Sequence, residues 1–147
     1  MTKAFALAAL MATAAVLTLA NAGTAAGDKK LDLVLGPTKS VHVDVGTKGY
    51  SRGDYFPARG PVRAKVGGKR IGSLAGIWTI VSPAGDDVSL VIHLADGNLH
   101  VDGRVNHSAK PSVLRVVAGT GAYEGAQGTA TFSYLTETLG ALRVELS

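Results

Sequence analysis

Cysteine is absent from this chain of 147 residues. No disulfide can therefore form, although disulfides are common in exported proteins. A lipoprotein anchor is also excluded, because it needs a cysteine for attachment of the lipid. After a leader segment at residues 1–22 (below), roughly 125 residues would remain, and a chain of that length can bury a sizeable core without cross-links.

Aromatic residues are scarce, at 5% of the chain. They are not interleaved with basic residues, so the stacking platforms of single-strand nucleic-acid binders are missing and no nucleic-acid partner is expected. The formal net charge is +4, and the positive charge is concentrated before residue 71. A solvated basic face and a face that meets an acidic surface both fit this pattern. The basic residues are Lys29, Lys30, Lys39, Lys48, Arg52, Arg59, Arg63, Lys65, Lys69 and Arg70.

Several catalytic and cofactor motifs are missing. The chain has no G-x-S-x-G nucleophile elbow, and its glycines do not match G-x-G-x-x-G or the phosphate-binding loop that ends in Gly-Lys-Ser/Thr. Gly119 and Gly121 are better explained by a tight turn and a bulge at a barrel rim, where glycine permits close approach of the backbone. We therefore expect no cofactor.

The first 22 residues have the features of a signal peptide. Lys3 is followed by an uncharged apolar run over residues 4–20, and Ala20 and Ala22 are the small residues that signal peptidase reads. A retained membrane anchor is the alternative, but the run is slightly short for the ~20 residues of a spanning helix. We expect cleavage before Gly23, a secreted domain at residues 23–147, and no stable membrane insertion after cleavage.

The rest of the chain predicts an all-β domain. Short runs of Val, Ile, Leu and Thr are separated by frequent glycines, as in strands joined by tight turns. No helical pattern interrupts them, so a barrel or a sandwich is expected. A loop is predicted over residues 47–61. The predicted strands are 31–35, 40–45, 62–66, 71–82, 88–95, 98–105, 113–118, 129–135 and 138–146.

The clearest local unit is the hairpin over residues 88–105. With Asp96-Gly97 as a two-residue turn, Leu94 would face Leu99 and His93 would face His100. One face of the hairpin is then apolar and the other largely polar, as a sheet with one buried face requires. A His93–His100 pair could ligate a metal, but no further ligand spacing supports that interpretation, so no metal site is predicted.

Two stretches of the chain carry a family resemblance. The first runs from Gly53-Asp54-Tyr55-Phe56 to Ala75-Gly76-Ile77-Trp78, and the second ends in Gly119-Thr120-Gly121-Ala122-Tyr123-Glu124-Gly125-Ala126-Gln127-Gly128. Together they resemble the allene oxide cyclase and dirigent superfamily over residues 40–135. The resemblance implies an eight-stranded antiparallel β-barrel with a central cavity, often assembled as a homotrimer and not defined by any cofactor.

The resemblance also suggests site residues. His42 and Asp44 match, in a loose register, a polar pair on a cavity-facing strand of the cyclases, and they are the candidate catalytic pair. A His beside a carboxylate can act as an acid–base pair near neutral pH, although the polar face of such a strand can also simply meet water. Trp78 stands where the cyclases have a cysteine. Trp78, Tyr55 and Phe56 are the candidate substrate-binding residues.

Two functions remain open at this point. In the first, the exported barrel binds a small hydrophobic molecule and steers its cyclisation or isomerisation, so that any enzyme activity would be of the isomerase or cyclase type. In the second, it is a non-catalytic protein that captures a ligand or meets a surface through its basic residues.

Overall fold

The computed structural model describes residues 28–147. The predicted signal peptide lies outside these residues, so its removal stays a prediction. Within residues 28–147, no helix is long and apolar enough to cross a membrane.

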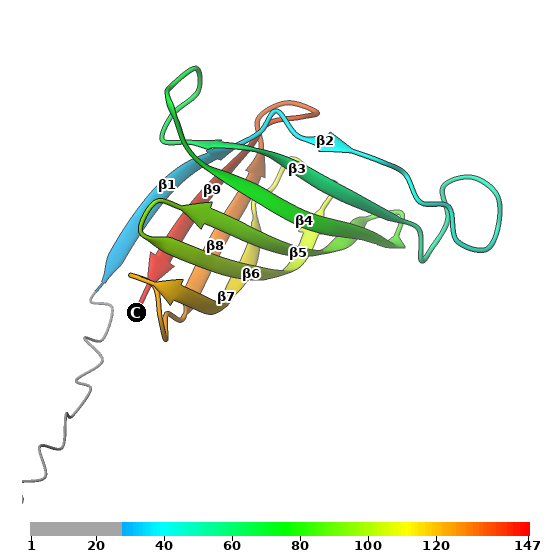
Figure 1. Ribbon diagram of the computed structural model, residues 1–147. Coiled ribbons are helices and arrows are strands. Elements are labelled where there is room, and N and C mark those ends of the chain that lie inside the picture. Colours follow the sequence, from blue (N-terminus) through cyan, green and yellow to red (C-terminus); the bar gives the residue numbers. More distant parts are fainter. Residues whose placement is uncertain (1–27) are drawn as a thin grey trace, which may run out of the picture.

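The described chain folds into one antiparallel sheet that closes on itself (Figure 1). The strand order is β1-β9-β8-β7-β6-β5-β4-β3-β2, and a pairing between β1 and β3 completes the ring. β2 is a two-residue strand that pairs with the same edge of β3 as β1 does, further along β3, so the barrel itself has eight longer strands, as predicted. The strands are β1 (Lys29–Leu35), β2 (Lys39–Ser40), β3 (Tyr55–Arg63), β4 (Arg70–Ser82), β5 (Gly85–Leu94), β6 (Gly97–Asn106), β7 (Ser112–Gly121), β8 (Gly128–Tyr134) and β9 (Gly140–Leu146).

The core follows from the alternation of side chains along each strand. In β9, Leu142, Val144 and Leu146 are buried, while Arg143 and Glu145 between them are exposed. Successive side chains of a strand point to opposite faces of the sheet, so a period of two fills the barrel and leaves its outer face polar. The apolar residues that point inward from the eight barrel strands form one buried cluster.

The β5–β6 hairpin forms as predicted but with a different register. Leu94 pairs with Gly97, His93 with Asn98 and Ile92 with Leu99, so the predicted pairs His93–His100 and Leu94–Leu99 are wrong. The turn residues are Ala95 and Asp96, and Gly97 already belongs to β6. Because the register error is two residues, every side chain keeps its predicted face.

The predicted loop over residues 47–61 is wrong at its C-terminal end, since β3 begins at Tyr55. Prolines argue against a central strand because they cannot donate to the ladder. The carbonyls of Pro57 and Pro61 accept hydrogen bonds from Val41 and Gly36, so both residues direct their backbone polar groups away from β4. The missing N–H groups therefore face an irregular segment and cost little. The predicted strand over residues 40–45 is reduced to Ser40 of β2 and an isolated bridge at Val43.

The glycine-rich motif lies in the connection from β7 to β8. Tyr123 and Ala126 of this connection are buried in the core cluster, so it covers one end of the barrel. A Cβ on Gly119 would lie 2.1 Å from the backbone oxygen of Tyr123, which explains why this position needs glycine. The opposite end of the barrel remains accessible.

Candidate functional site

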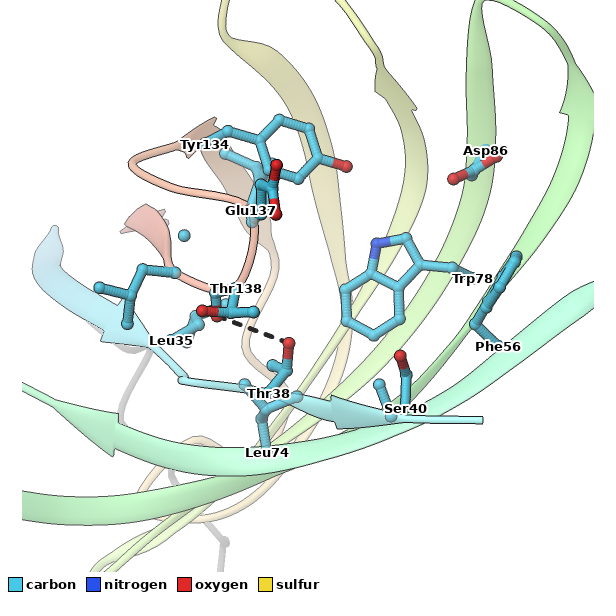
Figure 2. A pocket seen from close by; sticks show the side chains of 14 residues that line it. Leu35, Thr38, Ser40, Phe56, Leu74, Trp78, Asp86, Tyr134, Glu137 and Thr138 are labelled. Carbon is cyan, nitrogen blue, oxygen red and sulfur yellow. Dashed lines mark hydrogen bonds between the residues drawn. The ribbon is translucent and has the colours of Figure 1, made fainter. Parts of the chain in front are cut away.

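A cavity of about 260 Å³ opens at that accessible end (Figure 2). Its walls come from the ends of β1, β4 and β8, the starts of β3, β5 and β9, and the connection from β8 to β9. We call it the rim cavity. Its lining is Leu35, Thr38, Ser40, Phe56, Ala58, Leu74, Trp78, Asp86, Phe132, Tyr134, Glu137, Thr138, Leu139 and Gly140.

Aromatic side chains form much of the wall. Phe56 and Trp78 are cross-strand partners on β3 and β4, and both point into the barrel because they share the face of buried Ala58 and Leu74. On the other side, Phe132 packs edge-on against Tyr134, with ring centroids 4.9 Å apart. Two of the three predicted substrate-binding residues, Phe56 and Trp78, therefore line the cavity. Tyr55 is half-buried on the opposite face of β3 and does not line it.

One buried carboxylate belongs to this wall. Asp86, at the start of β5, has a side chain that is 12% exposed. Its Oδ2 lies 2.9 Å from Nε2 of His107 in the connection from β6 to β7. Its Oδ1 is buried and has no hydrogen-bond partner among the described residues. A buried acceptor without a partner is costly, so Asp86 resembles a functional group more than a structural one.

His107 is held by two acceptors at once. Nε2 faces Asp86, and Nδ1 lies 3.3 Å from the carbonyl oxygen of Pro83. Only the doubly protonated ring donates to both. Accordingly, the hydrogen bond to Asp86 is the main cause that raises the pKa of His107 above its usual value of 6.5.

Tyr134 adds a second polar group. Partial burial raises the pKa of its phenol, and the negative charge of Asp86 raises it further. Figure 2 shows the hydroxyl of Tyr134 and the indole nitrogen of Trp78 both pointing into the cavity. The site thus combines a carboxylate acceptor with neutral donors on an aromatic wall.

The candidate pair His42 and Asp44 is not brought together. Asp44 accepts a hydrogen bond from the backbone N–H of Gly49 at 2.9 Å, in the exposed loop. His42 instead lies 3.0 Å from Oδ2 of Asp54. Neither His42 nor Asp44 lines the rim cavity, and their catalytic role stays a prediction.

Asp54 organises the loop that precedes β3. It is fully buried and accepts hydrogen bonds from the backbone N–H groups of Val45 and Ser51, from the Ser51 hydroxyl, and from His42. These donors, led by Val45, lower its pKa from 3.8 to about 2. The charged form of Asp54 therefore ties the loop together.

The ring of His42 connects this loop to the cavity wall. It stacks on Phe56 with centroids 5.0 Å apart and on Tyr50 with centroids 4.5 Å apart, and both interplanar angles are 16°. His42 thus supports the outer side of a residue whose ring lines the rim cavity.

Sequence reasoning missed Asp86 and His107, and it treated Tyr134 only as one of several aromatics that could fill the core or line a pocket. The inward direction of the Asp86 side chain could have been predicted, because Asp86 lies two residues before Val88 on the inward face that continues through Leu90 and Ile92. His107 lies in a turn, where no periodicity indicates the direction of a side chain. Its pairing with Asp86 depends on how the barrel brings two turns together.

Comparisons with known proteins show the fold. No protein-family model matches the sequence, and no curated protein matches it. A pyocyanin demethylase structure matches with a TM-score of 0.68 and 22% identity, over 81% of this chain and 100% of that chain. A pterocarpan synthase dirigent protein gives a TM-score of 0.68 and 18% identity, over 81% of this chain and 86% of that chain.

A third match is the Diels–Alderase AbmU from Streptomyces koyangensis, with a TM-score of 0.61 and 16% identity, over 82% of this chain and 63% of that chain. The resemblance stated from the sequence is therefore confirmed at the level of the fold. This chain folds as an eight-stranded antiparallel β-barrel that is similar to the barrel of the dirigent protein.

Proposed function

We propose that the protein binds a small, largely apolar molecule in the rim cavity and steers its cyclisation or isomerisation. The observation that carries the proposal is Asp86, a buried carboxylate with an unpartnered oxygen beside an aromatic-lined cavity. A concave apolar site with a few convergent polar groups is the usual form of a small-molecule site. Similar barrels bear the names of a demethylase, a dirigent protein and a Diels–Alderase, so the chemistry must be argued from this site.

The cavity limits the size of the ligand. Its volume of about 260 Å³ lies just below the range of roughly 300–1,000 Å³ that is typical of ligand pockets. The aromatic rings of Phe56, Trp78 and Phe132 favour a flat hydrophobic molecule of one or two rings. A hydrogen-bond donor on that molecule would satisfy Oδ1 of Asp86.

The site can move one proton without a change of oxidation state. Asp86 takes a proton from a carbon or hydroxyl of the ligand, the electron pair released shifts to form the new bond, and the same proton returns at a different atom. His107 donates to Oδ2 and fixes the direction of the carboxylate. Tyr134, kept as a neutral phenol, donates a hydrogen bond to the oxygen where charge develops. The rigid wall holds the ligand in one folded shape.

Binding is tested with the chain's single tryptophan. Candidate hydrophobic ligands are titrated while the fluorescence of Trp78 is recorded, and a saturable change is expected. Ala58→Leu fills the rim cavity and should abolish the response. Ala75→Leu is the matched control, because Ala75 is exposed on the neighbouring strand β4. Equal affinity in the two variants would exclude the rim cavity as the site.

Turnover is tested separately from binding. With a ligand that binds, Asp86→Asn should retain binding and lose conversion, as measured by chromatography of the product. The prediction for His42 and Asp44 is checked in the same assay, where a His42→Ala/Asp44→Ala variant with full activity would remove them from the chemistry. Binding without turnover in the native protein would favour the non-catalytic alternative.

We also propose that the protein is exported, on the strength of the leader pattern at residues 1–22. Intact-mass measurement of protein from the culture medium should give a chain that begins at Gly23. A homotrimer, which the family resemblance implies, is expected in light scattering of that material, and a monomer would contradict this expectation.

A further inference from the structure

A second concave site lies on the outer surface of the barrel, where β2, β3, β4 and β5 run side by side (Figure 1). It is a groove of about 460 Å³, and we call it the basic groove. Lys39 of β2, Arg59 of β3 and Arg70 of β4 line it, together with His93 of β5. No Asp or Glu is among its lining residues.

The charges of this groove oppose each other across the strands. Lys39 and Arg59 are direct cross-strand partners on β2 and β3. Arg70 in turn has Arg63 of β3 as its direct cross-strand partner, although Arg63 does not line the groove. Like charges placed directly opposite each other in an antiparallel pair repel and destabilise the sheet.

Elsewhere on the outer surface, the strand registers match opposite charges. Lys30 lies opposite Glu145, and Asp32 lies opposite Arg143. Both pairs form ion pairs, with N–O distances of 3.0 Å and 2.8 Å respectively. Asp87 and Arg104 do the same on β5 and β6, at 2.9 Å. The unbalanced positive charge at the groove is therefore a local exception on this barrel.

Within residues 28–147, no carboxylate compensates these cations. Lys39, Arg59 and Arg70 form no ion pair with a described residue. Arg70 donates a hydrogen bond from its Nε to the carbonyl oxygen of Gly72, which leaves its terminal nitrogens free. His93 is oriented by Asn98, whose Oδ1 lies 2.9 Å from Nδ1, so its Nε2 also remains without a partner.

We propose that the basic groove binds a phosphorylated small molecule. Guanidinium groups present paired N–H donors that match phosphate oxygens, and an ammonium group adds a point charge. An anion between Lys39 and Arg59 would convert their repulsion into attraction to a common partner. The groove is concave and bounded by Pro37 and Pro61, which suits a compact ligand better than a flat lipid surface.

This site is separate from the rim cavity, and of the lining residues only Leu74, in the wall between them, belongs to both. The basic groove lies outside the barrel wall, whereas Asp86 and Trp78 face the interior. Binding at the groove should therefore leave the response of Trp78 to an apolar ligand unchanged, and failure of either proposal leaves the other standing.

The test is calorimetric titration of the folded protein with pyrophosphate at low ionic strength. We expect saturable binding that weakens as salt is added. Arg59→Gln should weaken it at least about tenfold, because it removes a bidentate donor. Lys110→Gln is the matched control, since it removes the same charge from an exposed turn and should leave affinity unchanged. Lys39→Gln serves as a second groove variant.

The possible outcomes distinguish binding of a phosphorylated small molecule from binding by net charge and from binding to a lipid surface. Loss of affinity in the groove variants, with the Lys110→Gln control unchanged, supports the proposal. Equal weakening in Arg59→Gln and Lys110→Gln would reduce binding to net charge and overturn it, as would no binding at low salt. Vesicles with and without phosphatidylglycerol form the lipid arm. Binding to the anionic vesicles but not to pyrophosphate would assign the groove to a membrane surface and also overturn the proposal.

A thermal measurement gives a second readout. Pyrophosphate should raise the melting temperature of the native protein, since a ligand that binds the folded state stabilises it. Arg59→Gln should raise the melting temperature without ligand, because it removes the repulsion with Lys39, and should gain little from added pyrophosphate. A lower melting temperature for Arg59→Gln would show that the cross-strand repulsion is not present.

Discussion

Leu99 tests whether the barrel is packed solid beyond the rim cavity. It lies on β6, is fully buried and has Ile92 of β5 as its cross-strand partner. It does not line the rim cavity. Leu99→Ala removes three carbon atoms from the interior and leaves the strand and its register unchanged, so the cost reports on packing alone.

The size of the effect follows from two contributions. Loss of burial costs roughly 0.8 kcal/mol per carbon, or about 2.4 kcal/mol in all. If ~50 Å³ of the vacated space stays empty, the cavity adds about 1.2 kcal/mol at roughly 24 cal/mol per Å³. We therefore expect a loss of ~3.5 kcal/mol in the free energy of unfolding. For a folded unit of about 120 residues each kcal/mol corresponds to ~4 °C, so the melting temperature should fall by ~14 °C.

The assay is equilibrium urea unfolding, with the slope m compared between variants. Val117→Ala is the control, because Val117 is exposed on β7 and its truncation should change stability by less than ~0.5 kcal/mol. Leu99→Ala should also keep the affinity of the rim cavity for an apolar ligand. A loss below ~1 kcal/mol would refute the close packing of this region, and a loss of ligand affinity would refute the confinement of the cavity to the rim.

Further predictions concern charge and backbone. The pKa of Asp54 is about 2 in the folded protein instead of 3.8, so charged Asp54 stabilises the fold above pH 3.8, and this stabilisation is lost as the pH falls through 2. In Asp54→Asn, the melting temperature should therefore depend less on pH between about pH 2 and 4. The pKa of His107 should be found above 6.5 by NMR. Protonated His107 then stabilises the fold below pH 6.5, and this stabilisation is lost as the pH rises through the pKa of the folded state. Asp86→Asn should lower the pKa of His107 again. Gly119→Ala should destabilise the fold by more than ~2 kcal/mol because of its backbone clash, whereas Gly125→Ala, with φ +73 and open space around it, should cost only ~1 kcal/mol.

The fold was predictable because a barrel of this size depends on alternation. The faces of β5 and β6 follow from the order of apolar and polar residues, and they survive an error of two residues in the register. β3 was harder to predict, since Pro57 and Pro61 indicate a loop. Only the structure shows that their backbone polar groups face the irregular segment before it.

The site was predictable only where it lies on strands. Phe56 and Trp78 line the rim cavity because the alternation of β3 and β4 directs them inward. His107 lies in a turn, and its position depends on the packing of two connections. His42 pairs with Asp54, twelve residues away, because the loop between them folds back. No periodicity in the sequence encodes that contact.

The two His–carboxylate pairs differ in how far their carboxylates are satisfied. Asp54 accepts four hydrogen bonds and has a pKa of about 2, which is the pattern of a structural anchor. Asp86 has one hydrogen-bond partner, His107, and its buried Oδ1 has no partner among the described residues. That pattern is expected of a carboxylate that binds a ligand. Asp54 still influences the site through His42, which stacks on Phe56.

Substitution of the two carboxylates should therefore change different kinetic constants. Asp54→Asn loosens the support of Phe56 and should weaken ligand binding, seen as a raised KM with kcat nearly unchanged. Asp86→Asn keeps the wall intact and removes the base, so kcat should fall while ligand affinity persists. Measurement of both constants for both variants decides the assignment. If Asp54→Asn lowers kcat as strongly as Asp86→Asn does, the pair at His42 takes part in the chemistry, and the separation of anchor from base is wrong.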